Sequence, residues 1–184
     1  MKIIIQFMFV FLAWNSHALA EGSSTKDNNL TQVIKQAEAG DASAQARLGW
    51  IYSNGIGVTL DADKAVEWYE KAAAQGYPKA QFALGEIHLT GEGVVKDPAK
   101  AVTWYQKAAA QGYIKAQYNL GWMYQNGRGV AKDSVLAYAW HNLAARQGDE
   151  NAKKQRDLTG LNSVQRAEAE KISASWKQGQ VLSR

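Results

Sequence analysis

The chain repeats itself every 36 residues, and this repeat constrains the fold more strongly than any other feature. A Leu-Gly pair recurs at 48–49, 84–85 and 120–121, and the second and third rows share close to half of their residues. Glycine returns in register at Gly40, Gly76, Gly112 and Gly148. Tandem repeats of this length fold as one small unit per row, and each unit buries its apolar face only by stacking on its neighbours.

Each row predicts two helices. Small and apolar residues recur at steps of three and four, as at Ala44 and Leu48 in the first half of a row and at Ala65, Trp68 and Ala72 in the second half. The alanines let neighbouring helices approach closely, and one tryptophan per row is expected to fill the remaining space. These tryptophans are Trp68, Trp104 and Trp140.

The second helix of each row has start and stop signals at its two ends. An aspartate that can cap the helix precedes it in every row, and Pro98 occupies a first-turn position that tolerates a missing N–H group. A glycine follows the last turn, where it ends a helix. The capping residues are Asp61, Asp97 and Asp133, and the terminating glycines are Gly76, Gly112 and Gly148. The turn between the two helices, residues 54–60 in the first row, contains glycines that supply positive φ angles.

These signals predict an all-α fold. We expect an α/α solenoid, a right-handed superhelix of about three 36-residue helix hairpins with capping helices at both ends. The array would span residues 30–158, with a lone helix at 30–39 leading into the first row. Residues 159–184 would form a C-terminal capping helix and tail. That helix is expected over 163–178. Its residues available to pack on the array are Val164, Ala167, Ile172 and Trp176.

The first twenty residues predict a cleaved signal peptide. Lys2 is followed by an apolar run from Ile3 to Ala13 and then by Ala18-Leu19-Ala20, a small-x-small cleavage site. The run is shorter than the roughly twenty residues that a spanning helix needs, so a retained membrane anchor is the weaker alternative. Residues 21–29 would be a flexible linker. The sequence therefore predicts a periplasmic or secreted protein with no stable membrane anchor after cleavage, and the repeat type favours a bacterial source.

Composition narrows the function classes. The chain has no cysteine, which excludes disulfides, thiolate metal sites and a cysteine nucleophile. The 21 basic and 17 acidic residues are interspersed, and this small excess does not favour a nucleic-acid partner. The Gly91-Glu92-Gly93 turn lacks the further residues of a dinucleotide or phosphate loop and recurs in every row, so it is interpreted as structural.

No motif predicts catalysis, a metal or a cofactor. His88 and His141 fall on row positions that hold tyrosine in the other rows, so both are expected to be core substitutes. The sequence marks no carboxylate pair for general acid–base work and contains no Gly-x-Ser-x-Gly elbow. The chain is therefore predicted not to be an enzyme.

These residues together resemble the Sel1-like repeat proteins, relatives of the tetratricopeptide arrays, over roughly residues 30–158. The resemblance is carried by the Ala-x-x-x-Leu-Gly pattern that begins at Ala44, by the turn Gly55-x-Gly57-Val58 and by the segment from Asp61 to Ala73. It implies an adaptor or scaffold, since such proteins mostly hold other proteins, and exported bacterial members act in envelope assembly, signalling and host interaction. Some members are stapled by disulfides, from which this cysteine-free sequence departs.

Candidate partner-binding residues lie beside the Leu-Gly pairs. In tetratricopeptide-like solenoids the first helix of each row lines the concave face, so its variable residues would face a groove. Exposed aromatic residues on a rigid concave surface are typical anchors for peptides and proteins. The candidates are Trp50, Asn54, Lys79, Phe82, Glu86, Lys115, Tyr118, Trp122 and Asn126. The alternative for the two tryptophans is that they pack against neighbouring helices.

Three functions follow as hypotheses. The first is an exported adaptor whose concave groove binds a protein or peptide, in the bacterial cell envelope or at the host interface. The second is a secreted hydrolase acting on cell-wall fragments, which would need a pocket that buries two carboxylates within about 10 Å of each other. The third is a structural component of an envelope assembly, joined through its outer face or its C-terminal helix.

Overall fold

The computed structural model describes residues 29–183, so the predicted signal peptide and all of the predicted linker but Asn29 lie outside the described residues. Within 29–183 the regular structure consists of helices and no strands. A first helix spans 29–38. The others are α2 (Ala42–Asn54), α3 (Ala62–Ala74), α4 (Pro78–Thr90), α5 (Pro98–Ala110), α6 (Ile114–Asn126), α7 (Ser134–Arg146), α8 (Glu150–Asp157) and α9 (Ser163–Ser175).

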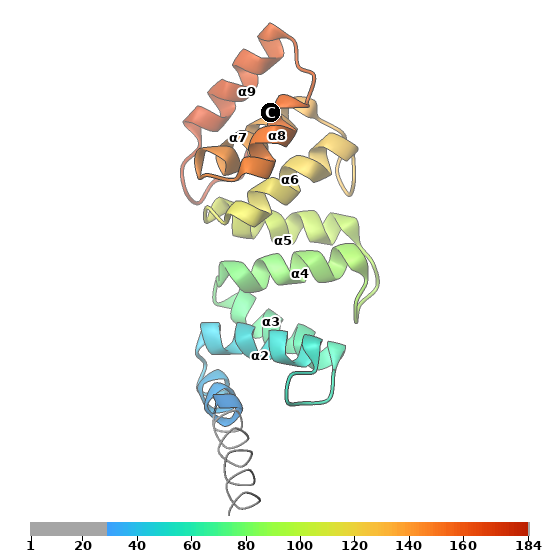
Figure 1. Cartoon of the computed structure of the whole chain (residues 1–184), viewed down its shortest axis with the longest axis vertical. Helices are drawn as coiled ribbons and strands as arrows, with labels where there is room; N and C mark the ends of the chain where they lie inside the picture. The colour runs from blue at the N-terminus through green and yellow to red at the C-terminus, as the bar shows by residue number, and fades with distance from the viewer. Residues whose placement is uncertain (1–28, 184) are drawn as a thin grey trace, which may run out of the picture.

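The helices stack in chain order. Figure 1 shows α2 to α7 lying one above another along the long axis, and each of them contacts the next helix in the sequence. Helices α2 and α3, α4 and α5, and α6 and α7 form the three predicted hairpins. The prediction of an all-α solenoid of about three hairpins is therefore confirmed.

The predicted helix caps are present. The side chains of Asp61, Asp97 and Asp133 each accept a hydrogen bond from first-turn backbone N–H groups of the helix that follows. At the end of α3 the Gly76 N–H donates to the Ala73 carbonyl over 3.0 Å, and Gly76 has a φ of 83°. A side chain is strained at that φ, which is why the row ends on glycine.

The glycine of the Leu-Gly pair has a separate role, because it makes room for an aromatic ring. Gly85 on α4 faces Tyr105 on α5, and a Cβ atom added to Gly85 would lie 2.4 Å from Cε1 of that tyrosine. The two helices of a hairpin can therefore lie this close only with glycine here.

The tryptophans differ in burial along the array. Trp140 is fully buried, as predicted. Trp68 and Trp104 are only partly buried, and the ammonium groups of Lys71 and Lys107 lie 4.0 and 4.1 Å from the centroids of their rings. The prediction that every tryptophan fills the space between helices thus holds fully for Trp140 alone. The other two have one face at the surface under a lysine.

A row of glutamines links consecutive repeats. Nε2 of Gln111, just after α5, donates to Oε1 of Gln81 on α4 over 2.8 Å and to the Gly76 carbonyl over 2.8 Å. Gln81 in turn donates to the Ala73 carbonyl at the end of α3 over 3.3 Å. The same pattern joins Gln75 to Gln45 and Gln147 to Gln117. In each pair the glutamine on the first helix is buried, and its hydrogen bonds fix how one hairpin sits on the next.

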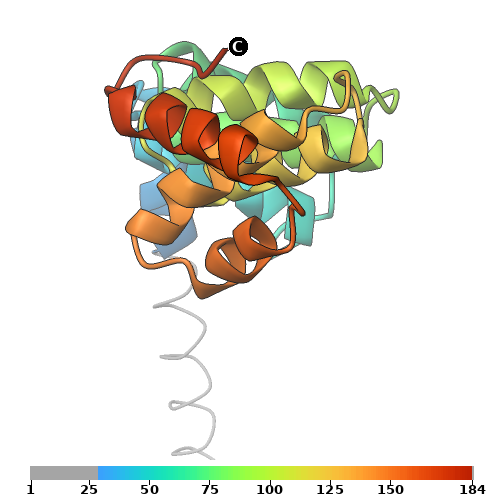
Figure 2. The same ribbon diagram turned by 90° about the horizontal axis from the view of Figure 1, so that it is seen from above.

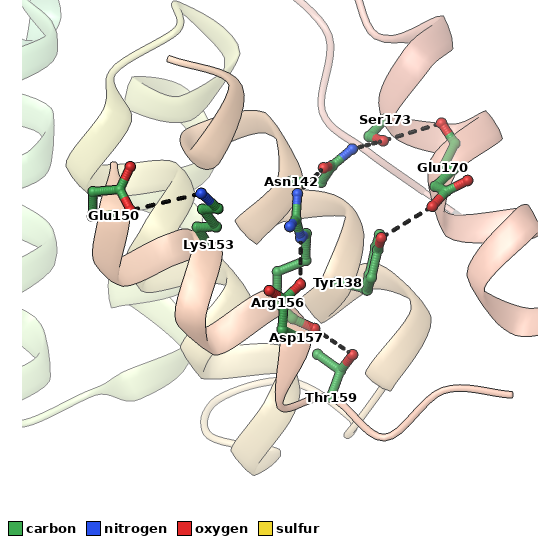
Figure 3. A network of polar contacts seen from close by, with 9 residues as sticks. All are labelled: Tyr138, Asn142, Glu150, Lys153, Arg156, Asp157, Thr159, Glu170 and Ser173. Carbon is green, nitrogen blue, oxygen red and sulfur yellow. Dashed lines mark hydrogen bonds and ion pairs between the residues drawn. The ribbon is translucent and has the colours of Figure 1, made fainter. Parts of the chain in front are cut away.

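The C-terminal helices close the end of the array. Figure 2 shows α9 lying across the end of the stack, and Figure 3 shows the polar contacts that hold it. Tyr138 on α7 donates to Glu170 on α9 over 3.1 Å, and Asn142 donates to Ser173 over 2.8 Å. Arg156 on α8 donates to Asn142 over 3.1 Å, so one side chain of α7 connects both capping helices.

The predicted C-terminal helix needs two corrections. It ends at Ser175 and not at residue 178, and the chain then folds back so that the Gly179 N–H donates to the Ala110 carbonyl at the end of α5 over 2.6 Å. Val164 and Ala167 are exposed, whereas Ala169 and Ser173 are buried. Ile172 and Trp176 pack on the core as predicted. The residues that face the core, 169, 172, 173 and 176, follow helical spacing, which turns Val164 and Ala167 outward.

Candidate functional site

An open groove runs across the first helices of the repeats. Its volume is about 650 Å³. The lining comes mainly from α2 and α4 and reaches α6 at one residue. The lining residues are Ser43, Ala46, Arg47, Trp50, Ser53, Tyr69, Tyr77, Lys79, Phe82, Ala83, Glu86, Ile87, Glu92 and Lys115.

Five of the nine residues selected from the sequence line this groove. They are Trp50, Lys79, Phe82, Glu86 and Lys115. Three of them, Lys79, Phe82 and Glu86, lie on α4 at steps of three and four residues, which brings them to one face of the helix. The groove face of α4 is therefore basic at its first turn, aromatic in the middle and acidic in the next turn.

Aromatic rings form the apolar part of the groove. The Phe82 ring lies 5.6 Å from the ring of Tyr105 and 5.3 Å from that of Tyr113, centroid to centroid, so aromatic rings of its own repeat support it. Trp50 is 51% exposed, although it is a large aromatic residue on a helix. A packed phenylalanine and an exposed tryptophan in one groove offer a surface that an apolar side chain can cover.

Glu86 is held in place by two donors. The Tyr105 hydroxyl on α5 donates to Glu86 Oε1, and Asn119 on α6 donates to the same oxygen over 2.7 Å. Burial is the main reason that the pKa of Tyr105 is raised, and the neighbouring carboxylate of Glu86 raises it further. Tyr105 therefore stays protonated and keeps donating to Glu86.

Four selected residues lie outside the groove lining. The side-chain amides of Asn54 and Asn126 donate to the carbonyls of Trp50 and Trp122 on their own helices, both over 2.8 Å. Trp122 is partly buried against the core, and the Tyr118 ring lies 5.4 Å from the His141 ring. For Trp122 this is the packing alternative given above, and a role in binding for these four residues stays a prediction.

Sequence reasoning missed part of the lining. Ser43 and Arg47 precede Trp50 by seven and three residues, so the helical period already placed them on its face. Tyr69, Tyr77 and Glu92 come from the second helix and from turns, and no signal in the first helices points to them. Arg47 adds a third basic side chain to the two lysines found from the sequence.

A smaller hollow adjoins the groove. Its volume is about 370 Å³, and Arg47 and Trp50 line both hollows. The other lining residues are Asn29, Leu30, Val33, Ile51, Ile56 and Gly57. Trp50 is therefore a ridge between two mainly apolar depressions.

The groove contains two carboxylates, and they do not form a buried pair. Its carboxylates are Glu86 and Glu92, of which Glu86 is partly buried and Glu92 is exposed, so it does not bury the acid pair that glycosidic hydrolysis needs. In residues 29–183, no three histidine, aspartate or glutamate side chains gather where they could hold a metal ion. None of the helices in the same part of the chain is long and apolar enough to cross a membrane.

His141 is a core residue, as predicted. It is fully buried on α7, and neither ring nitrogen has a hydrogen-bond partner within the described part of the chain. Burial lowers the pKa of His141 to about 4, against a smaller opposing effect of Asp149. His88 is half-buried on the row position of Tyr52 and Tyr124, of which Tyr52 packs on a core cluster.

Comparison with known proteins identifies the repeat. Three consecutive segments, residues 42–77, 78–113 and 114–149, match the model of the Sel1 repeat, and each segment contains one hairpin of the structure. No curated protein matches the chain.

Solved structures show the same architecture. The chain is similar to a Sel1 repeat protein from Oxalobacter formigenes, with 44% identity and a TM-score of 0.66 over 70% of this chain and 97% of that one. It is also similar to a protective antigen present in uropathogenic Escherichia coli strains that displays an SLR fold. That match has 40% identity and a TM-score of 0.76, over 82% of this chain and 33% of the antigen. The cysteine-rich protein B of Helicobacter pylori shares the fold, at 24% identity and a TM-score of 0.56 over 68% of this chain and 93% of that one.

Proposed function

Because the chain belongs to the Sel1 repeat family, whose members are generally scaffolds for protein–protein interaction, we propose that it is an exported bacterial adaptor. In this proposal the groove across α2 and α4 holds a peptide or protein segment of the partner. The adaptor acts in the cell envelope or at the host interface and needs no cofactor.

One observation carries the proposal. Phe82 and the exposed Trp50 both line a groove that is built on a stack of helices. Preformed aromatic surfaces bind with little loss of conformational entropy, because the protein side is already ordered. The residues that form the stack cap helices, make the glutamine contacts or fill the core. Trp50 does none of these, and half of its surface is exposed to solvent.

The groove supports an adaptor better than a hydrolase, since its carboxylates do not form a buried pair. Binding through the outer face or α9 in an envelope assembly stays the alternative hypothesis.

The exported location rests on the sequence of residues 1–20 and on the relatives. A protective antigen is a protein that a host's immune system meets. The similarity of this chain to the Escherichia coli antigen supports a location of the chain at the envelope or the host interface. The location is tested by the mature N-terminus. We expect mass spectrometry of the protein from a bacterial periplasmic fraction to find Glu21 as the first residue, and Ala18→Arg to block this cleavage. Uncleaved protein in the cytoplasmic fraction would contradict export.

The groove is tested by site-specific photocrosslinking in the source cell. A photoreactive phenylalanine analogue replaces Trp50 in one variant and Trp68 in a matched control, because Trp68 is a half-buried tryptophan on α3 that does not line the groove. We expect a discrete protein adduct from position 50 that disappears when Phe82→Ala is added. Equal adducts from both positions, or an adduct from position 68 alone, would assign binding to another face.

A further inference from the structure

The groove carries three positively charged side chains that form no ion pair with the described residues, 29–183. Arg47, Lys79 and Lys115 line it from three successive first helices, α2, α4 and α6. Among residues 29–183, ion pairs join Lys64 to Asp61, Lys153 to Glu150, and Arg156 to Asp157, and none of these pairs includes a groove cation. Arg47 has a neutral partner, the amide oxygen of Asn29, at 3.0 Å.

Two of these cations follow the repeat. Lys79 and Lys115 are separated by one row of 36 residues and stand in the first turns of α4 and α6. Both are exposed, whereas the first row has Ser43 at the equivalent position, where it contacts the Tyr77 hydroxyl over 3.3 Å. Equivalent positions in a solenoid lie along one edge, so the two lysines form a basic edge of the groove. We use "basic edge" for Lys79 and Lys115.

The acidic residues of the groove do not neutralise this edge. Glu86 is two helical turns from Lys79 along α4, and its Oε1 atom already accepts from Tyr105 and Asn119. Glu92 lies in the turn after α4, further again from the basic edge. Along α4 the groove face therefore runs from basic Lys79 through aromatic Phe82 to acidic Glu86.

From this arrangement we propose that the occupant of the groove is an acidic protein segment. Its apolar side chain covers Phe82 and Trp50, and carboxylates flanking that side chain lie against Lys79 and Lys115. The inference rests on the proposed function, which names the groove but not the chemistry of its occupant. A protein segment fits better than a nucleic acid, because the aromatic residues take a side chain and the groove carboxylates would repel a continuous polyanion.

The experiment selects peptides without knowing the partner. Phage-displayed random peptides of about twelve residues are selected on the immobilised repeat protein, on Lys79→Glu/Lys115→Glu and on Trp50→Ala/Phe82→Ala. A fourth protein, Lys100→Glu/Lys154→Glu, changes net charge by the same amount at exposed lysines outside the groove. Peptides enriched on the wild type are synthesised, and their dissociation constants are measured at low and high salt.

We expect the wild type and the Lys100/Lys154 control to enrich peptides in which Asp or Glu flanks an aromatic or aliphatic residue. Reversal of the basic edge should weaken these peptides about tenfold or more and shift enrichment toward Lys and Arg, because each exposed contact becomes a repulsion. Raising the salt should weaken binding to the wild type and much less to the reversed variant.

The outcomes separate the two proposals. Enriched peptides that depend on Trp50 and Phe82 but are neutral or basic would overturn the acidic segment and leave the groove function standing. Enrichment that survives the Trp50 and Phe82 substitutions, or none at all on the wild type, would overturn the groove function itself. Tighter binding of a single-stranded oligonucleotide than of any peptide would overturn the choice of a protein segment.

Discussion

The Tyr105 hydroxyl on α5 donates a hydrogen bond to the Glu86 carboxylate on α4, across the hairpin of the second repeat. Asn119 of the third repeat donates to the same carboxylate oxygen over 2.7 Å. The first and third repeats carry Trp50 and Trp122 at this position, so Glu86 gives the second repeat a polar link to its successor that the equivalent positions lack. A lining residue of the groove is therefore also a structural joint.

Replacing Glu86 should destabilise the array. Glu86→Ala leaves the largely buried Tyr105 hydroxyl and the Asn119 amide without their acceptor, and we expect a loss of about 1–3 kcal/mol in the free energy of unfolding. Urea unfolding followed by circular dichroism measures it. Glu92→Ala is the matched control, because Glu92 is an exposed carboxylate of the same groove, and it should stay within about 0.5 kcal/mol of the wild type. An equal effect of both substitutions would contradict a stabilising role for the hydrogen bonds that Glu86 accepts.

Adding a methyl group at Gly85 should cost more than adding one at Gly49. The new Cβ would lie 2.4 Å from the Tyr105 ring at position 85, but 3.0 Å from the Tyr69 ring at position 49. Overpacking of this kind costs about 1–3 kcal/mol, and the better helix propensity of alanine offsets about 1 kcal/mol of it at both positions. We expect Gly85→Ala to lower the midpoint of urea unfolding clearly, and Gly49→Ala to change it little. The reverse order would show that the Tyr105 ring moves aside freely.

The repeat made most of the fold predictable. Helix positions, aspartate caps and terminating glycines depend on a few neighbouring residues, and the three aligned copies remove the ambiguity of any single one. The face of α9 was predicted only in part: Ile172 and Trp176 pack on the core, but Val164 and Ala167 are exposed. This helix has one copy, so no aligned repeat fixes which of its residues face inward. A period cannot be checked where nothing repeats.

The site was predictable only in part. The helical face beside the Leu-Gly pair predicted Trp50, Lys79, Phe82 and Glu86. It did not predict the hydrogen bonds that Glu86 accepts, because their donors lie on α5 and α6. Such contacts between helices are set by packing and not by local sequence. Gln45, Gln81 and Gln117 recur in register like the glycines, so their linking role had a signal in the sequence that only the contacts explain.

The glutamine contacts should matter for stability. Gln81→Ala removes the oxygen that accepts from Gln111 over 2.8 Å and the amide that donates to the Ala73 carbonyl, both at the junction of the first two repeats. We expect a loss of about 1–3 kcal/mol in the free energy of unfolding, since buried polar groups lose their partners. Gln36→Ala, at an exposed glutamine of the helix over 29–38, is the control and should change little. A neutral Gln81→Ala would mean that the helices are positioned by apolar packing alone.

His141 should make the stability depend on pH. Burial holds its pKa at about 4 in the folded protein, below the ordinary value of 6.5, so the unfolded chain binds the proton first as the pH falls. The stability is therefore complete above about pH 6.5 and decreases as the pH is lowered toward 4.

Between pH 7.5 and 4.5 we expect the wild type to lose about 2 kcal/mol more than His141→Phe, which keeps a ring against Tyr118 but cannot titrate. Urea unfolding of both proteins at the two pH values measures this difference. The carboxylates titrate in both proteins and cancel in the comparison. Equal losses in the two proteins would show that His141 accepts a proton in the folded state as easily as in the unfolded chain, which its full burial and unpartnered nitrogens argue against.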